Sequence, residues 1–269
     1  MRERDLVGRA GRFIVEGEVT LRLLLSGRAR FSAESILIAP ERLPGLADAL
    51  AAQAARLAEP PPVYLAGKRV MSAVAGFPIH RGVLAIGLRG PEPAAGSLVP
   101  RSPAPALVLG LAGLTNHDNV GGLFRNAAAF GADAVLLDAA TCDPLYRKAI
   151  RVSAGAALIT PFARLAPGAD WLALAGRLGL VPLALSPGGA EELTDLPALP
   201  RALLLLGSEG PGLPAPLMAR ARTLRIAMAP GFDSLNVATA GAIALHHLVQ
   251  ATRHVRATMS GNCRREPPN

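Results

Sequence analysis

The sequence predicts an α/β protein made of two units, the second of which is built on a parallel β-sheet. Two observations lead to this prediction. From residue 106 onward, short and almost entirely apolar runs alternate with segments of helical period. This alternation is typical of parallel strands that are buried on both faces and covered by helices. A stretch rich in proline, residues 91–105, separates this part from a smaller first part.

The first part, residues 1–90, has the pattern of a small α/β unit. Strand-like apolar runs lie at 36–40, 62–67 and 82–88. The Ala- and Leu-rich segment 43–57 predicts a helix that starts near Pro44. The proline-rich stretch that follows favours extended, polyproline-like backbone, so we predict a linker over 91–105.

The second part, residues 106–252, contains the longer series of elements. Buried strands are predicted at 106–114, 133–138, 181–186, 202–207 and 223–228. Helical patterns occur at 120–130, 170–178 and 235–249. Beyond Thr252 the apolar period is lost, and we predict a basic, disordered tail over 253–269.

Charge and cysteine content narrow the class of protein. A formal net charge of +8 favours a polyanionic partner, with nucleic acid the leading class. All basic residues except Lys68 and Lys148 are arginine, which binds phosphate in a bidentate manner; a coding bias toward arginine would give the same excess. Cys142 and Cys263 fit neither a disulfide framework nor a metal site. Since no segment resembles a secretory signal or a membrane span, we expect a soluble cytoplasmic protein without a metal.

Polar clusters, rather than the common fingerprints, follow the predicted strands. The sequence has no dinucleotide-binding, P-loop, zinc-protease or α/β-hydrolase motif. The first cluster, residues 115–133, predicts a helix capped by Asp118 or Asn119, with Arg125 in its second turn. Two successive glycines in the first turn cost roughly 2 kcal/mol relative to alanine. Close approach of another backbone or of a ligand would explain them, whereas a capped core helix with one solvated arginine is the simpler alternative.

Two further clusters follow later strands. Residues 207–213 contain three glycines, which let the backbone approach a ligand, and Glu209 is the only carboxylate there. In the cluster 228–248, Ser234 is the predicted N-cap of a helix and Asn236 lies in its first turn. Taken alone, the cluster 207–213 is explained equally well by a tight turn, and Ser234 and Asn236 by ordinary helix capping. All the clusters lie where open parallel sheets place ligand sites, at the carboxyl ends of strands.

Together, the order and content of the clusters resemble a known family. The segments Asn119 to Asp133, Gly207 to Leu213 and Ile226 to Gly241 are similar to the three signature motifs of the SpoU (TrmH-type) RNA 2′-O-ribose methyltransferases of the SPOUT superfamily. The resemblance covers 106–252, and the first ninety residues resemble, less specifically, an L30e-like RNA-binding domain. It implies a C-terminal trefoil knot that binds S-adenosyl-L-methionine, a homodimer, and rRNA or tRNA as the substrate.

The resemblance also assigns residues. Its catalytic motif positions fall on Asn119, Arg125, Glu209, Ser234 and Asn236, and backbone contacts to the cofactor on Leu206, Gly207, Ile226, Met228 and Leu235. Two positions depart from the family pattern, because Asn126 stands where Thr or Ser is common and Ala227 where Pro is common. They leave the subfamily and the substrate open. The guanidinium of arginine is a poor base, so we expect Arg125 to stabilise charge rather than to remove a proton.

We expect RNA to be held mainly through its phosphates, because aromatic residues are scarce in the first part. Arginines concentrate in the first thirty residues, at positions 2, 4, 9, 12, 22, 28 and 30, and a second basic cluster comprises Tyr146, Arg147, Lys148 and Arg151. A solvated basic edge is the simpler explanation of the N-terminal group. Two other functions stay open: a non-catalytic RNA-binding or ribosome-assembly protein on the same fold, and a base-directed knotted methyltransferase.

Overall fold

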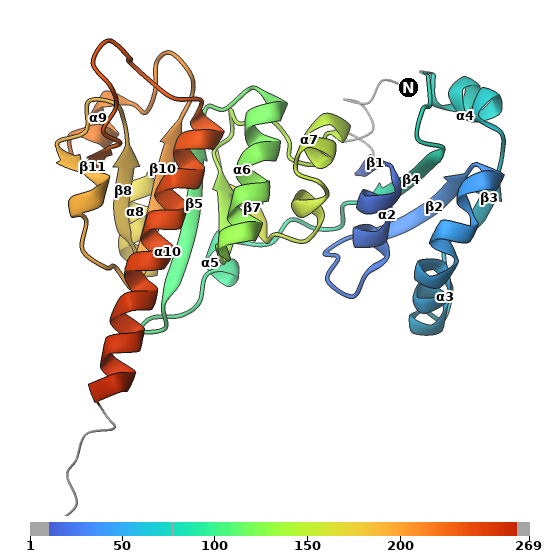
Figure 1. Cartoon of the computed structure of the whole chain (residues 1–269), viewed down its shortest axis with the longest axis horizontal. Helices are drawn as coiled ribbons and strands as arrows, with labels where there is room; N and C mark the ends of the chain where they lie inside the picture. Colours follow the sequence, from blue (N-terminus) through green and yellow to red (C-terminus); the bar gives the residue numbers. More distant parts are fainter. Residues whose placement is uncertain (1–10, 77, 263–269) are drawn as a thin grey trace, which may run out of the picture. The chain divides into compact units, whose positions relative to one another are not determined.

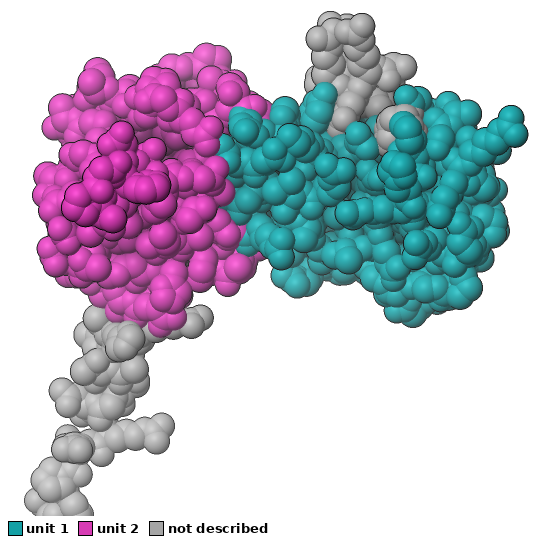
Figure 2. Space-filling view, turned by 45° about the horizontal axis from the view of Figure 1, so that its top comes forward, with its two compact units in different colours: residues 1–92, 116–125, 143–160 teal, residues 93–115, 126–142, 161–269 magenta. Residues whose placement is uncertain are grey.

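The computed structural model describes residues 11–76 and 78–262, which form two compact units, each with its own sheet (Figure 1). Unit 1 combines residues 1–92, 116–125 and 143–160, and unit 2 the remainder; the two are coloured separately in Figure 2. The units therefore do not follow the order of the chain, and the boundary between them falls within one helix, α6 (His117–Phe130).

Unit 1 is built on a mixed sheet in the order β1-β4-β2-β3. Its strands are β1 (Arg12–Glu16), β2 (Ser32–Ile38), β3 (Val63–Leu65) and β4 (Val83–Leu88). β4 pairs antiparallel with β1 and β2, whereas β3 is parallel to β2. The last three strands were predicted. β1 was missed because its five residues lie next to the charged N-terminal segment, although Phe13 and Val15 are fully buried.

The helices of unit 1 that precede β4 are short: α2 (Glu18–Leu25), α3 (Ala47–Arg56) and α4 (Lys68–Ala75). The helix predicted from residue 43 begins at Ala47. Two single turns of 3₁₀ helix, Pro40–Arg42 and Pro44–Leu46, occupy the preceding residues. Proline at the start of a turn and glycine directly after Pro44 disfavour a regular α-helix there, which explains the later start.

Ion pairs explain why residues 143–160 belong to unit 1. In α7 (Arg147–Val152), the Arg147 guanidinium lies 2.9 Å from the carboxylate of Glu16, which is itself buried. Arg89 forms a second, partly buried pair with Asp143 at 2.6 Å. Charges paired away from water hold their geometry more strongly than solvent-exposed pairs. These contacts join segments that are far apart in the sequence.

Unit 2 contains the parallel sheet that the apolar runs predicted. Seven strands among the described residues pair in the order β7-β6-β5-β10-β8-β11-β9, and every pairing is parallel. Their bounds are β5 (Ala106–Ala112), β6 (Ala134–Leu137), β7 (Phe162–Arg164), β8 (Val181–Leu185), β9 (Glu191–Glu192), β10 (Arg201–Gly207) and β11 (Arg222–Arg225). The run predicted as the last strand, 223–228, ends at Arg225, so residues 226–228 belong to the loop that follows. The very short β7 and β9 were not predicted.

The core of unit 2 is packed around its central strands. β10 lies between β5 and β8, and its residues before Gly207 are all buried. On one face, a methyl group added to Gly110 would lie 2.6 Å from Leu205 Cδ2 and 3.0 Å from the ring of Trp171. Glycine in β5 therefore makes room for the Trp171 side chain, which explains a residue that otherwise weakens a strand.

Besides α7, the α-helices after β4 are α5 (Ala95–Leu98), α6, α8 (Trp171–Leu178), α9 (Ala215–Met218) and α10 (Val237–Asn262). The backbone of α10 is helical as far as Asn262, beyond residue 253 where the sequence predicts the start of a disordered tail; residues 263–269 of that tail lie outside the described part. No proline occurs before Pro267, and extending a helix is easier than starting one. None of the described helices is both long and apolar enough to cross a bilayer.

The proline-rich stretch is anchored by Arg201, a buried residue at the start of β10. Its guanidinium donates to the carbonyls of Pro100 (2.9 Å) and Ala104, and also to those of Leu178 (2.6 Å) and Gly179 (3.0 Å). One side chain thus satisfies four backbone acceptors from two segments. The stretch also contains α5 and is not a uniformly extended linker.

We expect Arg201→Ala to lower the free energy of unfolding by about 3 kcal/mol or more, because four backbone carbonyls would lose the charged donor that they share. Urea denaturation of the full chain measures the change. Arg101→Ala removes the same charge from an exposed position of the same segment and should stay within about 0.5 kcal/mol of the parent. Equal effects of the two substitutions would contradict the anchoring role.

Candidate functional site

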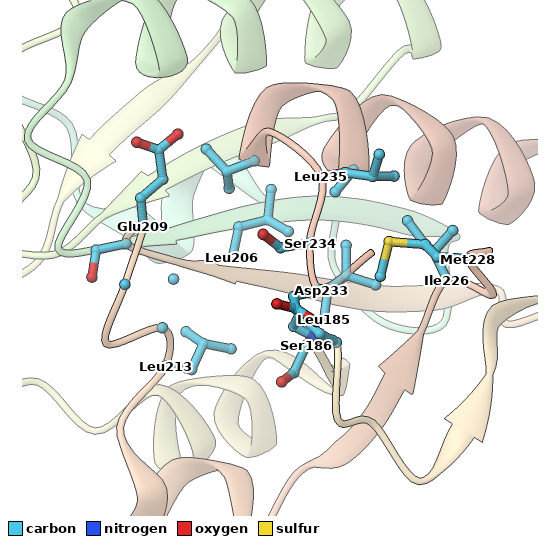
Figure 3. Close-up of a pocket in the computed structure, with 17 residues that line it drawn as sticks. Leu185, Ser186, Leu206, Glu209, Leu213, Ile226, Met228, Asp233, Ser234 and Leu235 are labelled. Carbon is cyan, nitrogen blue, oxygen red and sulfur yellow. The ribbon is translucent and has the colours of Figure 1, made fainter. Parts of the chain in front are cut away.

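A pocket lies in unit 2 at the carboxyl ends of three neighbouring strands, β8, β10 and β11 (Figure 3). Its volume is about 390 Å³, within the range typical of small-molecule sites. The described residues that line it are Leu185, Ser186, Pro187, Leu206, Gly207, Ser208, Glu209, Gly210, Gly212, Leu213, Ile226, Met228, Asp233, Ser234, Leu235, Val237 and Ala240. All five predicted cofactor contacts, Leu206, Gly207, Ile226, Met228 and Leu235, belong to this lining.

The loop after β10 folds back on itself and forms one wall. Ser208 and Gly212 form an isolated antiparallel bridge, and the Gly212 N–H donates to the Ser208 carbonyl at 3.0 Å. A methyl group on Gly207 would lie 2.4 Å from the backbone of Gly212 and Leu213. Gly210 and Gly212 have φ values of +89° and +68°, which L-residues rarely adopt. The glycines of this cluster are thus required by the loop itself.

The loop after β11 leads into α10, and Asn236 caps that helix. The Asn236 Oδ1 accepts from the N–H groups of Ala238 (2.9 Å) and Thr239 (3.3 Å). The prediction that Ser234 is the N-cap is therefore wrong, because the helix begins at Val237 and Asn236 occupies the capping position. Ser234 is exposed and lies on the pocket wall instead (Figure 3).

The second and third polar clusters meet at one contact. The Asn236 Nδ2 donates to the Glu209 Oε1 at 3.4 Å, and both side chains are exposed. One asparagine thereby caps α10 with its oxygen and holds the loop after β10 with its nitrogen. This contact unites two residues that the sequence assigned to separate loops.

The pocket is apolar at its base and acidic at its rim. Among the described residues that line it, none is basic, although the chain carries a net charge of +8. Glu209 and Asp233 are its two carboxylates, and Figure 3 shows them on different loops. Electrostatics in this pocket favour a ligand with positive charge and disfavour a polyphosphate.

The first polar cluster belongs to α6, and its residues Asn119 and Arg125 fall in unit 1. Asn116 caps the helix, because its Oδ1 accepts from the Asp118 N–H at 2.8 Å. The predicted caps, Asp118 and Asn119, are therefore wrong by two or three positions, and Arg125 lies in the third turn rather than the second. Asn119 is buried, whereas Arg125 is exposed and makes no side-chain hydrogen bond or ion pair within the described part of the chain.

The glycine pair of α6 allows close packing against α7. A methyl group on Gly121 would lie 2.7 Å from the Ala149 carbonyl oxygen and 2.9 Å from Val152 Cβ. Of the two explanations considered for these glycines, approach of another backbone accounts for Gly121. One turn earlier, burial and then the charge of Lys148 lower the pKa of His117, whose ring lies 4.4 Å from that of Tyr146. Both effects favour the neutral form of the imidazole.

Asn126, one of the two departures from the family pattern, has a defined contact. Its Nδ2 donates to the Ala238 carbonyl in the first turn of α10 at 2.8 Å. Sequence reasoning missed this link, and it also missed Leu185, Ser186 and Asp233 in the pocket lining. Leu185 and Ser186 could have been predicted, because the apolar run 181–186 ends there and its end marks another strand terminus at the same edge of the sheet.

Several arginines assigned to an RNA path are neutralised by carboxylates. Arg12 makes a two-bond contact with Glu34 at 2.6 and 2.7 Å, and Arg22 binds Asp48 at 2.8 Å. Arg28 and Arg30 are exposed, and the predicted residues at positions 2, 4 and 9 lie outside the described part. In the second basic cluster, Lys148 pairs with Asp118 at 2.6 Å, and Arg147 is paired as described above.

Comparison with known proteins gives one consistent result. The model of the SpoU rRNA Methylase family matches residues 106–246. A protein of Mycobacterium tuberculosis strain H37Rv, described as an uncharacterized tRNA/rRNA methyltransferase, is 38% identical over 262 residues, which cover 94% of this chain and 86% of the relative. A Synechocystis protein with the same description is 34% identical over 149 residues, 54% of each chain.

Solved structures agree with the fold. The SpoU methyltransferase AviRb from Streptomyces viridochromogenes, in complex with AdoMet, gives a TM-score of 0.76 at 22% identity and 95% coverage of both chains. A structure described as an RNA 2′-O ribose methyltransferase gives 0.70 at 25% identity, covering 93% of this chain and 94% of the other. These likenesses confirm the predicted α/β fold with its parallel sheet. With the family match over more than half of the sequence and the extensive identity to the mycobacterial relative, the chain belongs to the SpoU rRNA methylase family.

Proposed function

We propose that this chain is an S-adenosyl-L-methionine-dependent methyltransferase that modifies a ribose 2′-hydroxyl of rRNA or tRNA. Family membership supports methyl transfer to RNA. The ribose as the methyl acceptor is the finer part of the proposal. It is supported by the resemblance of the segment Ser234 to Val237 to the third motif, and by the structural likeness to an RNA 2′-O ribose methyltransferase.

The acidic, partly apolar pocket is the observation that carries this proposal. S-adenosyl-L-methionine combines a sulfonium, an ammonium and a carboxylate, so it carries one net positive charge. The pocket offers two carboxylates and no basic side chain among its described lining residues. Leucines 185, 206 and 213 supply apolar surface for an adenine ring, and the strand ends supply backbone N–H and C=O groups for its polar edge. The residues present therefore fit this cofactor.

We assign Arg125 the role of stabilising charge at the reacting ribose. The bound cofactor supplies an activated methyl group, so the protein has to position the hydroxyl and ease loss of its proton. Arg125 is exposed and its side chain has no hydrogen-bond or ion-pair partner among the described residues, which leaves its guanidinium available to a phosphate or a developing alkoxide. A guanidinium is in general a poor base, so this role does not include removal of the proton.

The other assigned residues act through position. Asn236 and Glu209 hold the loops after β11 and β10 together through their 3.4 Å contact. Ser234 lines the pocket from the same loop as Asn236. Asn119, which is buried in the first turns of α6, supports the helix that carries Arg125. These four residues therefore orient groups rather than exchange protons.

The proposal also includes an N-terminal L30e-like RNA-binding domain, a trefoil knot and a homodimer. The knot is supported by the resemblance of the segments from Gly207 and from Ile226 to the second and third motifs of this family. Light scattering coupled to size-exclusion chromatography tests the dimer.

We expect Arg125→Ala to reduce methyl transfer by at least about 100-fold, the effect of removing one electrostatic donor. The affinity for S-adenosyl-L-methionine should stay within about twofold, because Arg125 does not line the pocket. Tritium transfer to RNA and isothermal titration calorimetry measure the two quantities. Turnover equal to that of the parent protein would rule out the assigned role.

We expect Gly207→Ala to weaken cofactor binding by about tenfold or more, because the new methyl group would meet the backbone of the folded loop. Gly188→Ala is the matched control, since a methyl group there has no neighbour within 4 Å and its φ is not positive. Calorimetric titration with S-adenosyl-L-methionine measures both variants. Similar losses at the two positions would contradict the role of the loop.

One experiment separates ribose methylation from the two alternatives. RNA methylated with labelled cofactor is digested with a nuclease that needs a free 2′-hydroxyl. Label in resistant dinucleotides supports the ribose, whereas label in released bases supports a base-directed enzyme. Cofactor binding without transfer to any RNA from cells that lack this gene would favour the non-catalytic alternative.

A further inference from the structure

A second hollow lies in unit 1, where the segment after β2 meets the segment before β4. Its volume is about 290 Å³, and it is lined by Glu18, Val19, Arg42, His80 and Arg81. Arg42, His80 and Arg81 are all exposed. Three groups that carry or can acquire positive charge therefore surround one small hollow, which we call the basic pocket.

Two glycines bring the basic side chains together. Gly82 has φ +69°, and a methyl group on it would lie 3.4 Å from both Arg42 Cγ and Lys68 Cε. Gly17 has φ +101°, and a methyl group there would lie 3.1 Å from Arg81 Cδ and Nη1. The stems of Arg42 and Lys68 thus pass over one glycine and that of Arg81 over the other. A larger residue at either position would strain the backbone, because both glycines have a positive φ.

Nearby carboxylates are already engaged elsewhere. Glu18 accepts from Arg22 at 3.2 Å, and Arg22 also binds Asp48. Glu41 lies 3.5 Å from Lys68. Within the described residues, by contrast, Arg42 and Arg81 make no side-chain hydrogen bond or ion pair. The basic pocket therefore keeps two guanidinium groups whose donors are not engaged, unlike those of Arg12 and Arg22.

We propose that the basic pocket binds a backbone phosphate of the substrate RNA. The inference rests on the proposed function, because that reaction requires the chain to hold RNA. Two free guanidinium groups at the rim of a hollow suit a phosphate, whose oxygens match their paired donors. Contacts of this kind place RNA without reading its sequence. We therefore assign the RNA contact of unit 1 to the basic pocket rather than to the paired arginines Arg12 and Arg22.

The test compares two charge-matched double variants of the full chain. Arg42→Gln/Arg81→Gln removes the free arginines of the basic pocket. Arg101→Gln/Arg177→Gln removes two exposed arginines of unit 2 and lowers the net charge equally. Fluorescence anisotropy with a labelled, unmodified tRNA transcript measures RNA affinity over a series of KCl concentrations. Thermal unfolding and calorimetry with S-adenosyl-L-methionine check folding and the cofactor site.

We expect the pocket variant to bind the transcript about tenfold more weakly, with a salt slope smaller by about 1 to 2, because each lost phosphate contact lowers that slope by nearly one. The control should keep the parent affinity. Arg42→Lys/Arg81→Lys, which retains charge but not the paired donors, should recover most of the slope and part of the affinity. Cofactor affinity should be unchanged in all variants.

An unchanged affinity and slope in the pocket variant would overturn the inference, and so would an equal loss in the control. Failure of the proposed function has a different signature. If the parent protein transfers no methyl group to RNA while the pocket variant alone loses RNA affinity, the basic pocket is upheld and the methyltransferase assignment is overturned.

Discussion

The parallel pairing of β10 with both β5 and β8 is the constraint on which the rest of unit 2 depends. It buries β10 and brings Leu206 and Gly207 to the carboxyl edge of the sheet. Because β8 and β11 end at the same edge, the loops after the three strands share one space, and the pocket occupies it. Glycines let the loop after β10 turn back, and Asn236 then connects it to the start of α10. Each feature of the pocket follows from the position of one strand.

Arginine serves several purposes in this molecule, and its environment decides which. Arg201 is buried and binds only backbone carbonyls, so its charge stabilises the fold. Arg12 is paired with a carboxylate and adds little to the external field. Arg42, Arg81 and Arg125 are exposed and make no side-chain hydrogen bond or ion pair in the described part of the chain. A net charge is therefore a poor guide to where a polyanion binds, whereas the pairing of each guanidinium is a good one.

The sequence predicted elements well where one physical signal dominated. Apolar runs located the main strands of the parallel sheet, and motif resemblance identified the lining residues Leu206 and Met228. Prediction failed where a tertiary contact decided the outcome. The start of α10 depends on which of two nearby polar residues, Ser234 or Asn236, meets the free N–H groups. Residues 143–160 belong to unit 1 through contacts with distant segments, among them the ion pair of Arg147 with Glu16, which no local pattern encodes.

Because Arg201 anchors the proline-rich stretch, this stretch affects where an expression fragment that carries the parallel sheet should start. The family match begins at residue 106, and an expression fragment cut there would seem natural. Such a fragment would lose two of the four carbonyls that Arg201 binds, together with Val99, which is buried in the same core. A fragment from Pro93 to Asn262 would retain both. The folded part that contains the parallel sheet therefore begins before residue 106, with a short helix and a turn. The start of an expression fragment should be chosen from these hydrogen bonds rather than from the start of the family match.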